Sequence, residues 1–184
     1  MNLGLGLNCR RSALAVFATA ALLGACASAP TPADYASQTP RLDLHSYFNG
    51  PLTAHGIFAD RSGKVVRRFS VKMTGTWNGN QGVIDEDFTY SDGKKERRVW
   101  RLTDLGNGRY SGRADDVFGE AIGQAAGNAL NWRYTLALPV DGRVWEVQFD
   151  DWMVLMDERV MLNKAVMSKF GIRLGEVTLS FSKP

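Results

Sequence analysis

Apolar and polar residues alternate along most of the chain from Leu52 onward, which is the pattern of half-buried β-strands. The alternation is clear between Val65 and Met73 and again between Trp145 and Leu155. Strands that bury one face in this way form antiparallel sheets. Turn sequences of the Asp-Gly and Asn-Gly type separate the runs, and no helical periodicity of any length intervenes. The predicted strands are 52–60, 64–76, 82–91, 94–103, 108–115, 118–126, 130–139, 143–156, 159–169 and 172–183.

This succession predicts an all-β fold in which each strand pairs with the next. About 8 to 10 such strands favour an antiparallel up-and-down barrel of the calycin or lipocalin type, because closure removes exposed sheet edges. A sandwich of two sheets stays open as the structural alternative. Before the strands, the apolar positions within residues 42–48 predict a short helix or plug, which Asn49-Gly50-Pro51 ends.

The first thirty residues have a different pattern, that of a bacterial lipoprotein signal. Arg10 and Arg11 precede a short apolar run, residues 12–23, which ends in Leu23-Gly24-Ala25-Cys26. A basic segment followed by a short apolar one marks a secretory signal, and this run is shorter than the roughly 20 residues that span a membrane. We therefore expect cleavage before Cys26 and acylation of its thiol, palmitate included, as a membrane anchor. An ordinary signal peptide with an incidental cysteine is the alternative.

These signals divide the chain into three parts. We expect a signal peptide over 1–25, a lipidated flexible tether over 26–41 and a β-barrel domain over 42–184. The tether is small, polar and proline-containing, as flexible linkers are. Ala27 follows the cysteine, and a residue other than Asp at this place favours the outer membrane, with the barrel facing the periplasm.

The charge balance gives no reason to expect a nucleic-acid partner. The chain has 22 basic and 19 acidic side chains, and loss of Arg10 and Arg11 with the signal reduces the excess from three to one. No basic run with interleaved aromatic residues occurs.

The sequence also carries no catalytic signature. It has no G-x-S-x-G elbow, no P-loop and no dinucleotide fingerprint. His45 and His55 are too few for a three-histidine zinc site and are expected at the surface or in loops. The neighbours in Asp115-Asp116 and Asp150-Asp151 would point to opposite faces of a strand. We therefore predict no catalytic residue, no metal site and no cofactor.

Several stretches, spread over nearly the whole domain, are similar in sequence to one known family. They are Asp60-Arg61-Ser62-Gly63, Glu86-Asp87-Phe88-Thr89-Tyr90-Ser91-Asp92-Gly93, Arg98-Val99-Trp100-Arg101, Gly127-Asn128-Ala129, Asp150-Asp151-Trp152-Met153 and Lys169-Phe170-Gly171. In these stretches the chain resembles an uncharacterised bacterial lipoprotein family, domain of unknown function 3833. The resemblance implies a lipid anchor and a calycin-like barrel, and it implies no activity and no catalytic residue.

Charged residues on the apolar strand faces are the candidates for a binding site. By the alternation, Arg67, Glu86, Asp151 and Arg173 point inward, where charges are rarely buried unless they are paired. Ion pairs near a barrel end would explain them, and so would a polar patch in an apolar cavity. In the second case, Arg67 and Arg173 would meet a carboxylate or phosphate. The expected apolar lining is Trp132, Tyr134, Trp145, Phe149 and Met153.

Small residues occupy every second position from Gly119 to Ala129. If this stretch is extended, one of its faces is nearly bare. Such a face marks a bend, or it lets another chain segment or a ligand come close.

The favoured hypothesis is an envelope lipoprotein that binds a hydrophobic or amphipathic small molecule, a lipid or fatty acid, in its barrel. Its partners would be a membrane, through acylated Cys26, and this lipid-like molecule; the sequence identifies no protein partner. The alternative is a structural or assembly partner in the envelope, which needs an exposed apolar patch. A third hypothesis is a lipid-modifying enzyme with Asp151 or Glu86 as an acid or base of raised pKa.

Overall fold

The computed structural model describes residues 28–184, so the predicted cleavage site and Cys26 lie outside the described residues. A short 3-10 helix, η1 (Pro32–Tyr35), and a one-turn helix, α1 (Leu44–Tyr47), precede ten strands. The strands are β1 (Gly50–Asp60), β2 (Val65–Asn78), β3 (Gln81–Tyr90), β4 (Lys95–Gly106), β5 (Arg109–Arg113), β6 (Val117–Ala126), β7 (Ala129–Val140), β8 (Arg143–Leu155), β9 (Val160–Lys169) and β10 (Ile172–Ser182).

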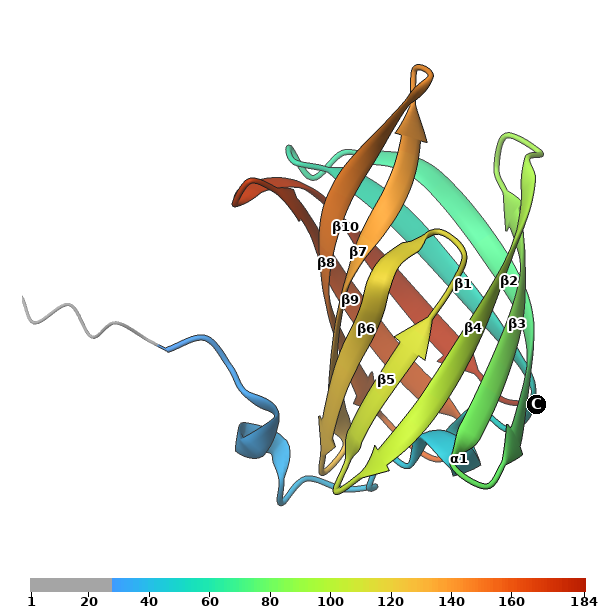
Figure 1. Ribbon diagram of the computed structural model, residues 1–184, viewed down its shortest axis with the longest axis vertical. Coiled ribbons are helices and arrows are strands. Elements are labelled where there is room, and N and C mark those ends of the chain that lie inside the picture. Colours follow the sequence, from blue (N-terminus) through green and yellow to red (C-terminus); the bar gives the residue numbers. More distant parts are fainter. Residues whose placement is uncertain (1–27) are drawn as a thin grey trace, which may run out of the picture.

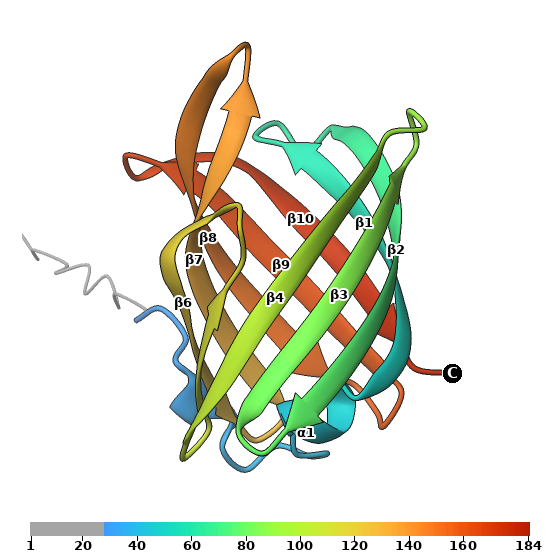
Figure 2. The same cartoon turned by 45° about the vertical axis from the view of Figure 1, so that its right-hand side comes forward.

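The strands form a closed antiparallel barrel. Each strand pairs with the next in sequence, and β1 pairs with β10 to complete the ring (Figures 1 and 2). This confirms the predicted up-and-down barrel and excludes the sandwich. Inward-facing positions are buried and outward ones exposed along strands such as β1 and β9, as the period-2 pattern requires.

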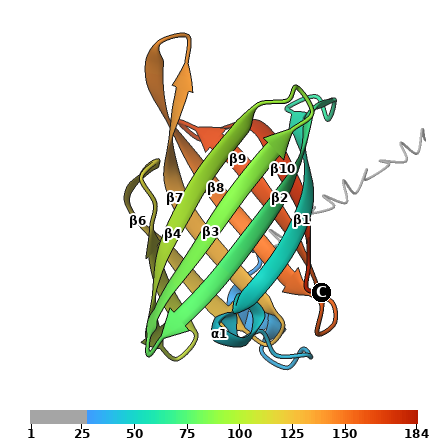
Figure 3. The same cartoon turned by 90° about the vertical axis from the view of Figure 1, so that its right-hand side faces the viewer.

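Helix α1 plugs one end of the barrel, which is the lower end in Figure 3. It begins after Asp43, whose carboxylate accepts a hydrogen bond from the Ser46 backbone N–H at 2.8 Å. Its apolar side chains and that of Phe48 are buried in the barrel core. The Tyr47 hydroxyl donates to the carbonyl oxygen of Arg159 at 3.1 Å, which ties α1 to the turn between β8 and β9. We call this the closed end.

Part of the predicted tether contacts the outside of the barrel near this closed end. η1 packs against β6 and β7, and the ring centroids of Tyr35 and Trp152 lie 5.5 Å apart. The Leu42 backbone N–H donates to the carbonyl oxygen of Gly127 at 2.8 Å. Residues 32–42 are therefore held by contacts that their linker-like composition does not signal.

The small-residue face predicted over Gly119–Ala129 is filled by a tryptophan of the barrel interior. A Cβ atom at Gly123 of β6 would lie 2.3 Å from the Trp132 ring, and one at Gly112 of β5 would lie 2.7 Å from it. Glycine permits this close approach because it has no side chain. Packing of Trp132 therefore explains the glycine at 123, whereas Gly127 lies against the backbone of Tyr35 in η1.

The β7–β8 hairpin extends past the rest of the barrel at the end opposite α1 (Figures 1 to 3). The β5–β6 hairpin is short, because β5 ends at Arg113 and pairs with only the last part of β4. We call this uneven end the open end.

Candidate ligand-binding cavity

The barrel interior holds a cavity of about 500 Å³. Small-molecule sites usually measure about 300 to 1,000 Å³, so the cavity has the size of such a site. A smaller void of about 60 Å³ lies next to α1, bounded by Leu44 and Phe48. The lining of the large cavity includes Phe58, Phe69, Phe88, Trp100, Leu136, Phe149, Met167 and Leu179.

Aromatic rings make one side of the wall rigid. The Trp100 ring stands edge-on to the rings of Trp132 and Tyr134, at centroid distances of 5.7 and 5.4 Å. The Tyr134 ring stacks on Phe149 at 4.9 Å. Such contacts add to the burial of the rings and restrict their motion, so the cavity is largely preformed.

Polar side chains from five strands interrupt this apolar wall. The polar cluster consists of Glu86 from β3, Arg98 from β4, Tyr134 from β7, Asp151 from β8 and Asn163 from β9. They reach the same space because each occupies an inward position of its strand.

Arg98 is the cation of the polar cluster, and it already has a carboxylate partner. Its Nη2 and Nε donate to Asp116 Oδ2 at 2.6 and 2.9 Å. Asp116 lies between β5 and β6, so this ion pair ties the short β5–β6 hairpin to the wall. Glu86 faces Arg98 across the β3–β4 pair but forms no ion pair with it among the described residues.

The two carboxyl groups of the polar cluster lie in an environment that favours their neutral forms. Burial raises the pKa of Asp151 to about 8, and the neighbouring Asp150 adds to this rise. Burial likewise raises the pKa of Glu86 to about 7, against the opposing effect of Arg98. Asp151 Oδ1 and Asn163 Nδ2 are buried without a hydrogen-bond partner in the structure. The two groups lie close enough for the Asn163 amide to oppose the rise in the pKa of Asp151, and Arg67 Nε is a further buried donor without a partner on the same wall.

Arg67 lines the cavity beside the β3–β4 turn. Its guanidinium carbon lies 3.5 Å from the centroid of the Tyr90 ring, and its Nη2 donates to Asp92 at 2.8 Å. Like Arg98, it therefore has a carboxylate partner within the chain.

Most of the residues predicted for the site line this cavity, and the two exceptions are Trp145 and Arg173. The predicted residues that lie on the cavity wall are Arg67, Glu86, Trp132, Tyr134, Phe149, Asp151 and Met153.

Trp145 lies outside the cavity because β8 pairs with β9 only from Gln148 onward, so the segment of β8 that carries Trp145 extends past its β9 neighbour. Its ring is 42% exposed, and the Lys169 ammonium lies 4.8 Å from the ring centroid. The alternation predicted the correct face of the strand, but it did not predict where the barrel wall ends.

Arg173 was wrongly assigned to the inner face of β10. The register of β10 with β9 shifts between Arg173 and Gly175, and this bulge reverses the side-chain alternation. Arg173 is exposed and pairs with Glu176 on the outside of the barrel. The predicted pair of arginines for an acidic head group is therefore not assembled.

Sequence reasoning missed Arg98 and Asn163. Arg98 shares the inward parity of Trp100 and Leu102, and Asn163 shares that of Met161 and Ala165. The alternation that identified Glu86 and Asp151 would have identified both residues.

Neither histidine lies on the cavity wall. His45 stacks on Trp77 at 3.9 Å, and its Nε2 lies 3.2 Å from Asp104, whereas His55 is exposed on the outer face of β1. Within residues 28–184, no three Asp, Glu, His or Cys side chains gather closely enough to hold a metal ion. In the same part of the chain, no helix has the length and apolar character needed to cross a membrane.

Comparisons with known proteins agree with the barrel fold. The S-type phycobiliprotein lyase of Guillardia theta is similar with a TM-score of 0.55 and 6% identity, over 78% of this chain and 94% of the lyase. At this identity the likeness shows the fold alone. More distant are EF1p2_mFAP2b bound to DFHBI, with a TM-score of 0.42, 10% identity and coverage of 76% and 99%, and a de novo designed fluorescence-activating β-barrel, with 0.40, 14%, 78% and 99%.

No curated protein matches the sequence. One family model does, over residues 20–183, which includes the whole barrel and so every residue of the polar cluster. The chain therefore belongs to the family described as protein of unknown function (DUF3833).

Proposed function

We propose that this protein is an envelope lipoprotein that binds a lipid-like small molecule inside its barrel. The observation that carries the proposal is the cavity of about 500 Å³, whose apolar wall is interrupted by the few side chains of the polar cluster. Binding sites for small molecules have this build, since the apolar wall supplies affinity and the polar groups fix orientation.

The wall indicates what kind of ligand fits. An alkyl or aromatic body would lie against Phe58, Phe149 and Met167, and each buried CH₂ contributes about 0.8 kcal/mol. The ligand's polar group would meet the polar cluster.

A carboxylate is disfavoured as this polar group. Arg98 and Arg67 already have carboxylate partners, so a carboxylate ligand would find no unpaired cation among the described residues of the cavity wall. A neutral group that both donates and accepts hydrogen bonds, such as an amide, ester-alcohol or hydroxyl, matches Asp151 and Asn163 better. We therefore expect a neutral amphipathic lipid in preference to the fatty acid that the sequence also allowed.

The membrane part of the proposal depends on Leu23-Gly24-Ala25-Cys26 and the basic and apolar segments before it. We propose that acylated Cys26 tethers the barrel to the outer membrane, facing the periplasm.

The first test compares an inward with an outward substitution on β10. Val177 lines the cavity and Thr178 faces outward, so Val177→Phe should fill part of the cavity while Thr178→Phe leaves it open. The probe is N-phenyl-1-naphthylamine, a neutral apolar fluorophore, titrated into residues 28–184. We expect a saturable fluorescence increase in the parent chain and in Thr178→Phe, with binding at least tenfold weaker in Val177→Phe.

Native mass spectrometry of the same three barrels, exported to the periplasm behind a cleavable signal peptide, should show a co-purifying lipid that Val177→Phe loses. Thermal unfolding checks that all three proteins are folded. Equal probe binding in Val177→Phe and Thr178→Phe would show that the probe does not enter the cavity and would contradict the proposal.

A further inference from the structure

Exposed apolar side chains gather at the open end of the barrel. They come from three neighbouring connections, β1–β2, β7–β8 and β9–β10, and we call them the mouth rim: Val66, Val144, Trp145, Phe170 and Ile172. Phe170 is 88% exposed. Val66 also lines the cavity, so the apolar surface continues from the cavity wall onto the mouth rim.

Phe170, at the tip of the β9–β10 turn, is not a residue type that the backbone conformation of this turn favours. Asn107-Gly108, Asp141-Gly142 and Phe170-Gly171 all have positive φ at both positions. Asn and Asp tolerate this conformation, whereas a bulky side chain is disfavoured in it. Phe170 thus gains no burial and sits in an unfavourable backbone conformation, so fold stability does not account for it.

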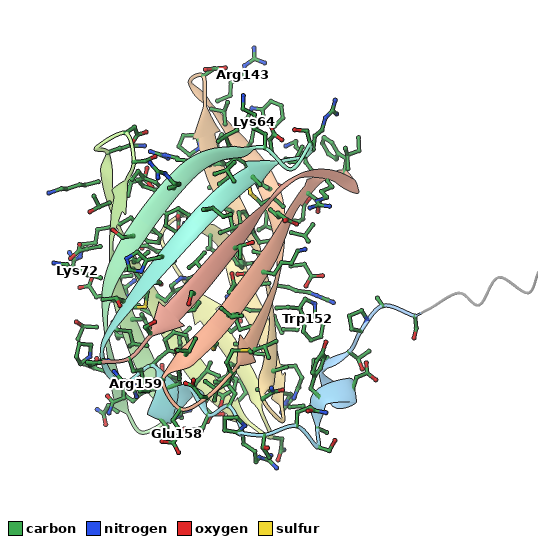
Figure 4. The ribbon with its side chains drawn as sticks, turned by 180° about the vertical axis from the view of Figure 1, so that it is seen from behind. Lys64, Lys72, Arg143, Trp152, Glu158 and Arg159 are labelled. Atoms are coloured by element: carbon green, nitrogen blue, oxygen red, sulfur yellow. The ribbon has the colours of Figure 1, made fainter. Side chains whose placement is uncertain are left out.

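Basic side chains accompany the mouth rim. The Lys169 ammonium lies 4.8 Å from the Trp145 ring centroid and 5.0 Å from that of Phe170, so it links the two hairpins. Arg143 and Lys64 lie at the same end, opposite Glu158 and Arg159 (Figure 4). Asp60 and Asp141 occupy the same turns, so the local excess of positive charge is small.

We propose that the mouth rim docks onto the surface of a lipid bilayer. Phe170, Trp145 and Ile172 would enter the boundary between head groups and acyl chains, and Lys169 would reach lipid phosphates. Aromatic rings with adjacent basic side chains are typical of membrane-interface surfaces, because the ring is buried while the charge stays at the phosphate level.

The position of the mouth rim favours a bilayer over a protein partner. A lipid that leaves a bilayer for the cavity must pass the open end, and the mouth rim gives it a continuous apolar path by way of Val66. This inference deepens the proposed function. Only the role given to docking, which is the passage of a lipid into the cavity, rests on that function. Docking itself is measured without a ligand.

The test uses residues 28–184, in which all ten strands close on themselves without the signal or the anchor. Sedimentation with vesicles of phosphatidylcholine and phosphatidylglycerol at 3:1 measures binding. Phe170→Asn replaces the exposed ring with a residue that suits the turn. Met156→Ser is the control, because Met156 is also an exposed apolar residue, at 54%, but lies in the β8–β9 turn at the closed end.

We expect the parent chain and Met156→Ser to bind vesicles, and Phe170→Asn to bind roughly tenfold more weakly, as the loss of one buried aromatic ring implies. Phe170→Asn should unfold at the same or a higher temperature and should bind N-phenyl-1-naphthylamine like the parent. Loss of vesicle binding with intact probe binding separates this inference from the proposed function.

Vesicle binding that is equal in Phe170→Asn and the parent, or absent in both, would overturn the inference. So would sedimentation equilibrium showing a lipid-free dimer that Phe170→Asn abolishes, because the mouth rim would then be an interface between two copies of the chain.

Discussion

Asp151 is a carboxyl group held in an apolar wall, and this makes the stability of the barrel depend on pH. Its pKa is about 8 in the folded chain, compared with an ordinary value of 3.8. Between these values the folded chain keeps a proton that the unfolded chain has released. The contribution of Asp151 to stability is therefore fully present below about pH 4 and is lost as the pH rises toward 8.

We expect the free energy of unfolding to fall between pH 5 and pH 8, by at most about 1.4 kcal/mol per pH unit for this group. Asp151→Asn, which mimics the neutral acid, should flatten the slope, whereas Asp87→Asn on the outer face of β3 should not. Urea denaturation at several pH values measures this. An unchanged slope in Asp151→Asn would show that Asp151 is ionised in the folded chain at neutral pH.

At this scale, the sequence predicted which side chains point inward wherever the strands are regular. Glu86, Asp151 and Phe149 were placed correctly because a strand alternates with a strict period of two. Arg173 was misplaced because a bulge inserts one residue, and turn residues do not indicate where a bulge lies. The raised pKa values follow from burial in three dimensions, which the sequence pattern does not measure.

At the scale of elements, β5, β6 and β7 pack together because Gly112 and Gly123 leave room for the Trp132 ring. Gly123→Ala would place a Cβ atom 2.3 Å from the Trp132 ring. Because backbone and ring must then move apart, we expect a loss of about 1 to 3 kcal/mol in the free energy of unfolding. Chemical denaturation at neutral pH measures the change.

The control for this prediction is the same substitution in a Trp132→Leu background, where the clash is removed. There Gly123→Ala should cost much less, because two residues in contact do not act additively. An equal cost in both backgrounds would mean that Gly123 is required for its backbone conformation and not for the approach of Trp132.

Elements were predicted well where turn residues mark their ends. Each predicted strand corresponds to one observed strand, since Asp-Gly or Asn-Gly turns interrupt the alternation at four of the nine hairpins and other glycine-containing turns do so at three more. The packing of η1 on the barrel was not foreseen, because it depends on Tyr35 meeting Trp152 across a distance in sequence that no local pattern spans.

At the scale of the whole molecule, the two ends of the barrel differ. The closed end holds α1, and η1 lies beside it; the open end bears the mouth rim (Figure 1). Pro32 lies six positions after Cys26, and an extended chain of six steps reaches about 20 Å. An anchor at Cys26 would therefore hold the closed end near its own membrane. In this arrangement the mouth rim faces away from the anchoring membrane, and the bilayer that it meets would be a second one.

The anchor can be tested directly on the full chain, because its two cysteines have different expected fates. Cys26→Ser should abolish incorporation of radioactive palmitate and move the protein from the membrane fraction, since the thiol is the only group there that accepts the acyl chains. Cys9→Ser should change neither result, because Cys9 is expected to leave with the signal peptide. Palmitate incorporation that survives Cys26→Ser would contradict the lipoprotein assignment, whereas membrane association alone can survive through the mouth rim. If membrane association were then lost in Cys26→Ser combined with Phe170→Asn, the mouth rim rather than an acyl chain would be holding the barrel at the membrane. The membrane that anchors the protein and the membrane on which the mouth rim docks would then be the same one.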